Sequence, residues 1–135
     1  MSVLIEPKFA RVIEQVEYMW FTTVRADGQP QPTPVWFIYD GTTFLIYSQP
    51  TAQKIRNLTA NPKVALSIAI SADAEEFLVI MGDAALDRSA PAPSQNAAYM
   101  RKYADSIPAI NMTPESFDAM FSLAIRVTPT RIRGQ

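Results

Sequence analysis

The sequence predicts a mainly β fold of the α+β class, in which an antiparallel, closed or partly closed barrel is flanked by helices. About six segments are rich in the aromatic and β-branched residues that are typical of strands. Most connections between these segments are short, and short connections favour antiparallel pairing over a parallel doubly wound sheet. A chain of 135 residues fits one domain, so we expect residues 1–135 to form a single barrel.

The composition restricts the chemistry that side chains alone can perform. The chain contains no Cys and no His, which excludes thiol nucleophiles, disulfides, Cys/His metal sites and Ser-His-Asp catalysis. We therefore expect no metal site, and we expect a bound cofactor to carry any reaction. The net charge of −1 argues against nucleic acid or an anionic membrane as a bulk electrostatic partner.

Nothing in the sequence predicts a targeting or membrane-spanning segment. The apolar start at residues 2–5 is short and ends at Glu6 and Pro7, unlike a signal peptide. No apolar run approaches the ~20 residues of a membrane span. The lack of Cys fits a reducing cytosol, so we expect a cytoplasmic protein. The missing apolar run gives the separate expectation that it has no membrane partner.

The first elements are a helix and a strand. Apolar residues at helical spacing predict a helix over residues 8–19 that covers the core. Aromatic and β-branched residues predict a strand over 17–25, so the two predictions overlap at 17–19. Asp27-Gly28 then supplies a hairpin turn.

The next strand, residues 30–39, has two unlike halves. Pro30, Pro32 and Pro34 alternate along the first half, which predicts a sheet edge or a break in pairing, because proline lacks the ladder donor. Residues 35–39 are all apolar, so we expect both faces to be covered. One face can point into the barrel, and the other needs a helix, a cofactor or a second subunit. After a turn at Asp40-Gly41, residues 43–48 form the return strand.

The remaining elements follow from caps, breaks and strand-like runs. A helix begins after Thr51, its expected N-cap, and stops at Asn61-Pro62. Strands are expected at 63–72, at 76–87 with a bulge at Gly82, and at 123–132. Between the last two strands we expect a surface loop at 88–94 and helices at 95–104 and 113–121, the second capped by Thr113 before a proline.

The helix after Thr51 carries an unusual charge pattern. The segment 48–63 contains Lys54, Arg56 and Lys63 and no acidic residue, although helix starts normally favour Asp or Glu. Free backbone N–H groups, a hydroxyl from Ser48 or Thr51 and two cations describe an anion pocket, most simply for a phosphate. The alternative is a solvated helix face. Likewise, Trp36 and its neighbours either flank a flat ring system or belong to the barrel core.

Six sequence blocks, in order and with fitting gaps, resemble the pyridoxamine-5′-phosphate-oxidase-like split β-barrel proteins, and within them the branch of deazaflavin (coenzyme F420)-dependent enzymes. The blocks are Phe21-Thr-Thr-Val-Arg-Ala-Asp-Gly28, Pro34-Val-Trp-Phe37, Leu45-Ile-Tyr-Ser-Gln-Pro50, Lys54-Ile-Arg-Asn-Leu58, Asn61-Pro-Lys-Val-Ala65 and Ile125-Arg-Val-Thr-Pro-Thr-Arg-Ile-Arg-Gly134. The resemblance implies a six-stranded split barrel and a homodimer with two cofactor sites at the subunit interface. It also implies that residues 33–36 lie against a flavin or deazaflavin ring and that Ser48, Lys54 and Arg56 hold the cofactor phosphate. The candidate cofactor-binding residues are therefore Thr33, Pro34, Val35, Trp36, Ser48, Gln49, Thr51, Lys54 and Arg56.

The resemblance implies an oxidoreductase in which a reduced deazaflavin passes a hydride to a small organic acceptor. An FMN-dependent reductase or oxidase of the same fold, and a non-enzymatic carrier of flavin or deazaflavin, remain as alternatives. No catalytic residue is selected, although Tyr39, Tyr47 or a water are candidate proton donors. The chain departs from its relatives in two places. Its Thr- and Pro-rich strand stands where pyridoxamine phosphate oxidases carry basic ligands, which argues against pyridoxal phosphate synthesis, and Gln135 stands where relatives often have an aromatic residue.

Overall fold

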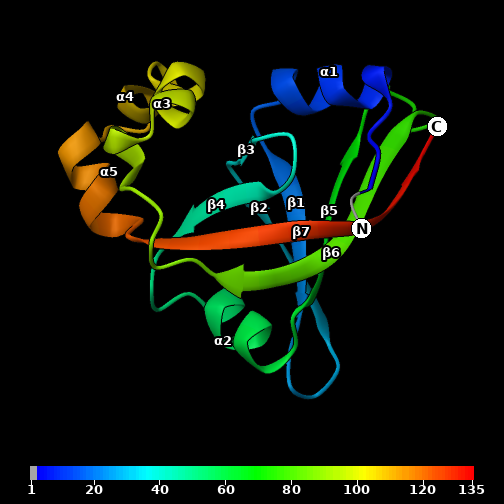
Figure 1. The fold of residues 1–135 in the computed structure, drawn as a ribbon, viewed down its shortest axis with the longest axis horizontal. Helices are drawn as coiled ribbons and strands as arrows, with labels where there is room; N and C mark the ends of the chain where they lie inside the picture. Colours follow the sequence, from blue (N-terminus) through cyan, green and yellow to red (C-terminus); the bar gives the residue numbers. More distant parts are fainter. Residues whose placement is uncertain (1–2) are drawn as a thin grey trace.

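The computed structural model describes residues 3–135 as one curled antiparallel sheet with helices at both ends and on one side (Figure 1). The strands are β1 (Met19–Val24), β2 (Pro30–Val35), β3 (Ile38–Tyr39), β4 (Phe44–Ser48), β5 (Lys63–Ala69), β6 (Phe77–Leu86) and β7 (Leu123–Gly134). The helices are α1 (Pro7–Gln15), α2 (Gln53–Ala60), α3 (Ala97–Tyr103), α4 (Ser106–Ala109) and α5 (Pro114–Met120), with a 3₁₀ turn η1 (Pro93–Gln95). The predicted fold class is confirmed.

The strand order shows how the barrel closes. The sheet runs β2-β1-β5-β6-β7-β4-β3, so β2 and β3, which are consecutive in the chain, lie at opposite edges. Only Trp36 and Phe37 separate these two strands. The sheet therefore curls until its two edges lie within reach of a two-residue link. The described residues form seven strands, and the prediction of six was wrong because residues 30–39 are two strands and not one.

The prolines occupy the place that the sequence predicts. Pro30, Pro32 and Pro34 lie on β2, an edge strand paired only with β1 among the described residues. The bulge at Gly82 is also confirmed, because the β6–β7 register shifts between Met81 and Gly82. A Cβ at Gly82 would stand 2.5 Å from the carbonyl oxygen of Thr128, so the two strands approach there more closely than a side chain allows.

Several element boundaries differ from the predictions. Helix α1 ends at Gln15 and β1 begins at Met19, so residues 17 and 18 of the overlap belong to neither element and only residue 19 lies in the strand. The N-cap of α2 is Ala52, whose side chain makes no cap bond, so the prediction of Thr51 was wrong. The physical reason is a turn in which the N–H of Ala52 donates to the carbonyl of Gln49 at 3.2 Å, which delays the helix by one residue. Asn61 ends α2 and Thr113 caps α5 as expected.

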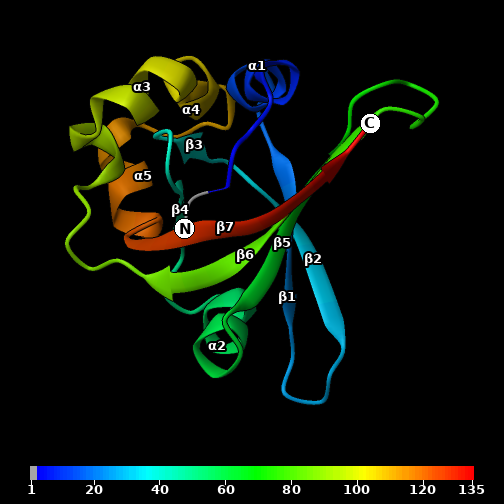
Figure 2. The same ribbon diagram turned by 45° about the vertical axis from the view of Figure 1, so that its right-hand side comes forward.

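The core has two parts, one on each face of β4. The barrel interior is filled by Phe21, Phe37, Ile46, Leu66, Ile80, Ile125 and their neighbours. The opposite face of β4 packs against the helices α3, α4 and α5 through Leu45, Tyr47, Tyr99, Tyr103, Ile107 and Phe117. Figures 1 and 2 show these three helices gathered on one side, with α1 and α2 at opposite ends of the barrel. All five residues of β4 are consequently buried.

The helices also explain why residues 35–39 read as covered on both faces. Phe37 is fully buried in the barrel, whereas Trp36 and Ile38 pack against the cluster formed with α3, α4 and α5. The sequence left a helix, a cofactor or a second subunit as the possible cover of the second face. Within residues 3–135 that cover is a group of helices. None of the helices in residues 3–135 combines the length and the apolar character needed to cross a membrane.

Candidate functional site

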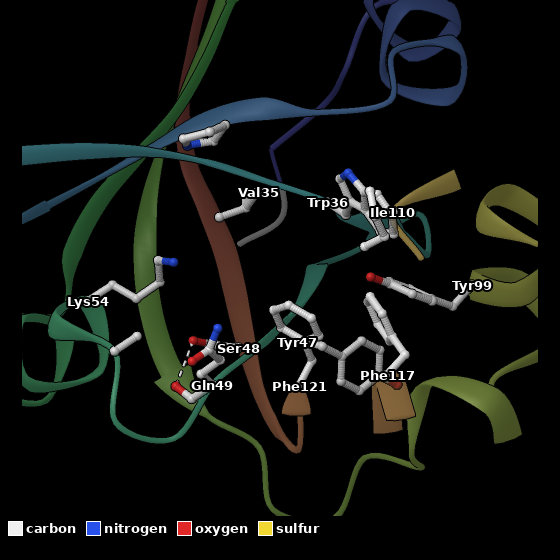
Figure 3. Close-up of a pocket in the computed structure, with 12 residues that line it drawn as sticks. Val35, Trp36, Tyr47, Ser48, Gln49, Lys54, Tyr99, Ile110, Phe117 and Phe121 are labelled. Atoms are coloured by element: carbon white, nitrogen blue, oxygen red, sulfur yellow. Dashed lines mark hydrogen bonds between the residues drawn. The ribbon is translucent and has the colours of Figure 1, made fainter. Parts of the chain in front are cut away.

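A cavity of about 280 Å³ lies where β2 and β4 end, between the start of α2 and the helices α3, α4 and α5 (Figure 3). Figure 3 shows Lys54, Ser48 and Gln49 at one side of this cavity and a wall of aromatic rings at the other. The lining residues are Pro34, Val35, Trp36, Tyr47, Ser48, Gln49, Ala52, Lys54, Tyr99, Ile110, Phe117 and Phe121. The cavity therefore has a polar end and an apolar end.

Lys54 dominates the polar end. It lies in the first turn of α2, is partly buried, and forms no ion pair with any acidic residue among residues 3–135. Burial lowers the pKa of its ammonium group below the ordinary value of 10.5. A desolvated cation without a counter-charge is costly, and an anionic ligand would offset that cost. Ser48 is buried beside it, and its hydroxyl donates to the carbonyl of Gln49 at 3.0 Å.

A polar network beneath α2 fixes the helix turn that carries Lys54. The buried amide of Asn57 donates to Thr23 Oγ1 on β1 at 3.0 Å and to Gln31 Oε1 on β2 at 2.8 Å. Its carbonyl oxygen accepts from Gln53 Nε2 at 2.9 Å. Because one residue bonds two strands and its own helix, α2 cannot rotate without breaking these bonds. The start of α2 is thereby fixed relative to β2.

The apolar end is a stack of aromatic rings. The indole of Trp36 lies parallel to the Tyr103 ring, with centroids 4.7 Å apart and 4° between planes, and it also stacks on Phe117 at 5.6 Å. Tyr99 meets Tyr47 edge-on at 4.9 Å. Offset and edge-on pairs of this kind add to the energy of burial. The wall is therefore a densely packed set of aromatic rings, which suits the apolar part of a ligand.

The hydroxyl of Tyr47 is already engaged. It donates to the carbonyl of Pro91 at 2.7 Å and accepts from Asn96 Nδ2 at 3.2 Å. Burial raises the pKa of Tyr47 above 10.0. Tyr39, the other candidate donor, lines a different hollow beside α1 and α3. Neither tyrosine presents a free proton to this cavity.

The structure brings together six of the nine predicted residues: Pro34, Val35, Trp36, Ser48, Gln49 and Lys54 line the cavity. Thr33 lines an adjoining groove, where its Oγ1 is buried and has no hydrogen-bond partner within residues 3–135. Thr51 and Arg56 lie outside both. The exposed guanidinium of Arg56 donates to the carbonyl of Thr51 at 3.1 Å and to Gln53 Oε1, so it turns back along α2.

Tyr47 was expected only as a candidate proton donor, and five further lining residues were not predicted: Ala52, Tyr99, Ile110, Phe117 and Phe121. A partial signal exists, since Phe117 and Phe121 are four residues apart and thus share one face of a helix. That spacing indicates an apolar helix face. It does not indicate which strand the face covers.

The adjoining groove extends the site past Lys54. It measures about 380 Å³, shares Lys54 with the cavity, and is otherwise lined by Thr23, Gln29, Pro30, Gln31, Pro32, Thr33, Gln53 and Asn57. Every one of these other side chains is uncharged. Together the two hollows can hold an elongated ligand with a flat apolar part, an anionic group at Lys54 and a hydrogen-bonding extension.

One family model covers almost the whole chain. The family model described as "Pyridoxamine 5′-phosphate oxidase" matches residues 5–135. An F420 reductase of known structure is 27% identical, with a TM-score of 0.73 over 97% of this chain and 100% of that chain. A conserved hypothetical protein of Mycobacterium tuberculosis, Rv2991, is 20% identical, with a TM-score of 0.76 over 98% of this chain and 85% of that chain. HutZ, the heme storage protein of Vibrio cholerae, is 15% identical, with a TM-score of 0.67 over 98% of this chain and 95% of that chain. The last two likenesses show the fold alone, and no curated protein matches in sequence.

Proposed function

Because the chain belongs to the pyridoxamine 5′-phosphate oxidase family, we propose that it is an oxidoreductase that binds coenzyme F420 and transfers a hydride to a small organic acceptor. The observation that carries this proposal is that one cavity combines a wall of aromatic rings with the partly buried ammonium group of Lys54, which has no ion-pair partner within residues 3–135. The similarity to an F420 reductase supports the choice of a deazaflavin over FMN.

The residues present fit such a cofactor. Lys54 and Ser48 would hold its phosphate, and Pro34, Val35 and Trp36 would lie against its ring. Thr33, which was expected at the ring, lines the groove beyond Lys54 and would meet the part of the cofactor past the phosphate. The orphaned Thr33 Oγ1 supports this fit, because a buried hydroxyl without a partner is costly and a bound polar group would satisfy it. Thr51 and Arg56 remain predicted cofactor ligands, although their positions outside the cavity make them weaker candidates than Lys54.

When bound, the cofactor supplies the hydride chemistry, and the chain supplies position and shelter. Lys54 neutralises the anionic group, and the ring wall excludes water from the apolar end. Tyr47 is committed to Pro91 and Asn96, so we propose that water delivers any accompanying proton.

The groove beyond Lys54 favours the longer cofactor. FMN ends at its phosphate, whereas coenzyme F420 continues into a tail. The groove offers that tail the uncharged side chains of Gln29 and Gln31, whereas the amide of Gln53 is already bonded to Asn57 and Arg56. Lys54 is the only charged residue among the described residues that line this groove, whereas Lys63 is exposed and pairs with Asp83 at 2.9 Å.

A second subunit would complete the site. The cavity is slightly smaller than the ~300–1,000 Å³ of typical ligand sites, and one flank of it is exposed. Tyr18 and Trp20 are 45% and 44% exposed, and they line a further groove of about 370 Å³ with Pro34 and Trp36. Such exposed aromatic residues are enriched at protein interfaces. We propose that this face packs against the partner subunit of a homodimer.

Absorbance titration tests the function. Purified protein is titrated with oxidised coenzyme F420 and with FMN, and the reduced deazaflavin is then supplied with a panel of unsaturated and carbonyl acceptors. We expect micromolar binding of coenzyme F420 and acceptor-dependent oxidation of its reduced form. Retention of yellow FMN through purification would favour the FMN-dependent alternative, and binding without turnover would favour a carrier. Failure to bind either cofactor would refute the proposal.

A further inference from the structure

Two consecutive residues at the end of α3 contact the short link between β2 and β3. The hydroxyl of Tyr103 accepts a hydrogen bond of 2.8 Å from the backbone N–H of Phe37. Its own proton has two carbonyl acceptors, Glu17 at 2.7 Å and Phe37 at 2.9 Å. Tyr103 is fully buried, so these bonds are shielded from water.

Lys102 binds the same link. Its ammonium group donates to the carbonyl of Phe37 at 3.1 Å and to the carbonyl of Ile13 on α1 at 3.3 Å. It also lies 3.8 Å from the centroid of the Phe37 ring, a cation–π contact. Both backbone polar groups of Phe37 are thus bound by α3, at the point where the chain leaves one edge of the sheet for the other.

These contacts reach the candidate site through Trp36. The Trp36 indole lines the cavity, precedes Phe37 in the chain, and lies flat on the Tyr103 ring. Its backbone is therefore fixed by bonds to its neighbour, and its ring plane is fixed by the stack. Arg101, the preceding residue on α3, is exposed and makes none of these contacts among the described residues.

We propose that Lys102 and Tyr103 are positioning residues that set the backbone and the ring plane of Trp36 in the wall of the cofactor cavity. The inference rests on the proposed function in so far as Trp36 lies against the cofactor ring. The orientation of Trp36 itself does not depend on any ligand, and it can be measured in the free protein.

The charge on Lys102 supports a pH-dependent readout. Burial lowers its pKa to about 8, although Glu14 and Glu17 oppose this shift. Asp40, Tyr39 and Arg101 also face Lys102 across the hollow beside α1 and α3. The pKa of Asp40 is lowered and that of Tyr39 is raised, so neither changes charge near pH 8. Loss of the Lys102 proton removes the cation–π contact and weakens its bonds to both carbonyls.

The test uses tryptophan fluorescence. The chain has two Trp residues, Trp20 and Trp36, so W20F leaves Trp36 as the single reporter. Acrylamide quenching and emission of Trp36 are measured from pH 6 to pH 9.5 in W20F, alone and combined with K102M, K102R, Y103F or R101M. Urea unfolding of each variant checks that it is folded. The affinity of each for coenzyme F420 and FMN is then measured at pH 7.

We expect K102M and Y103F to increase quenching of Trp36 and to weaken cofactor binding about tenfold, the equivalent of ~1.4 kcal/mol. In W20F alone, the emission and quenching of Trp36 should change as the pH passes through about 8. In K102M this change should be absent. A terminal amine titrates in the same pH range, so the pH alone does not identify the group. A pH-dependent change that K102M abolishes is assigned to Lys102. K102R keeps a permanent charge, so it should restore low quenching without the titration.

R101M is the matched control, and at pH 7 its quenching and its cofactor affinity should equal those of W20F alone. The inference is overturned if K102M and Y103F change the quenching of Trp36 no more than R101M does. It is also overturned if Trp36 moves but the affinity for a cofactor that W20F binds stays unchanged. If W20F and the unsubstituted protein bind neither cofactor, the proposed function fails instead, while quenching and its pH profile still decide the role of the two residues.

Discussion

Asn57 donates a hydrogen bond of 3.0 Å to Thr23 Oγ1, and both residues are buried. We expect N57A to lower the free energy of unfolding by ~1–3 kcal/mol, because it leaves Thr23 and Gln31 without their donor. Urea unfolding measures the change. T59A, on the exposed side of the same helix, should stay within ~0.5 kcal/mol of the parent. Equal stability of N57A and the parent would show that this network does not hold α2.

Lys54 is the cation whose removal should most weaken cofactor binding. We expect K54A to reduce the affinity by ~1.5–3 kcal/mol, the worth of a hydrogen bond to a charged group, and to leave the fold intact. R56A should have a smaller effect, because its guanidinium is bonded to Thr51 and Gln53. Absorbance titration of both variants decides the comparison. If K54A binds the cofactor as tightly as the parent does, Lys54 is part of a solvated helix face and does not contact the cofactor.

The same lysine predicts a pH dependence of binding. Burial lowers the pKa of Lys54 in the free protein, and a bound anion would raise it again. Binding therefore takes up a proton at alkaline pH, and the affinity should fall as the pH rises through the lowered pKa. Titrations between pH 7 and pH 10 measure this slope. K54A should lack this pH dependence of the affinity. The same slope in K54A and in the parent would assign the pH dependence to another group.

Trp20 tests the proposed dimer. Its side chain is 44% exposed beside Tyr18 and Pro34. We expect W20K to weaken self-association by at least about tenfold, or ~1.4 kcal/mol, because a lysine at the centre of an apolar contact must lose its hydration. Analytical ultracentrifugation measures the association. L4K changes an exposed apolar residue outside that groove, and it should leave the association as in the parent.

Asp87 predicts a loss of stability in acid. Hydrogen bonds from Ser89 and then from Arg126, which lies 2.8 Å away, lower its pKa to about 2. The carboxyl of Asp87 thus binds its proton less tightly in the folded state than in the unfolded state. The stability that the ionised Asp87 contributes is therefore complete above pH 3.8 and is lost as the pH falls towards 2. The stability difference between the parent and D87N, measured by urea unfolding, should shrink over that window. D105N, a substitution of an exposed aspartate, serves as the surface control.

Gly82 predicts a steric penalty at the bulge. In G82A the new Cβ would stand 2.5 Å from the Thr128 carbonyl oxygen, so β7 must move. We expect a loss of ~1–3 kcal/mol, as for other overpacked sites, visible as a lower thermal midpoint. A85S, an exposed position on the same strand, serves as the control. A stable G82A would mean that β6 and β7 can separate locally without cost.

Local chemistry was sufficient to predict most of the fold. The prolines of β2, the bulge at Gly82 and the cap of α5 each follow from a backbone property of one residue type. The polar end of the cavity was predicted for a similar reason, since Ser48 and Lys54 are close in sequence. These features need no knowledge of distant contacts.

The features that were missed depend on contacts between distant residues. The break after Val35 has no local signal in an apolar run, and it is stabilised by Tyr103 and Lys102, more than 60 positions away. The aromatic wall forms only when α5 meets Trp36. Arg56 was expected at the anion pocket, but which face of α2 meets the sheet is decided by Asn57.

The prolines of β2 restrict how this protein can assemble. In β2 only Gln31, Thr33 and Val35 can donate, and these alternate with the prolines, so the donors all point towards β1. The outer side of residues 30–34 therefore offers carbonyl acceptors and no donor. A second strand, from another copy or from a misfolded chain, cannot complete a ladder there. Association on this side is limited to packing of faces, and this edge cannot seed fibril growth.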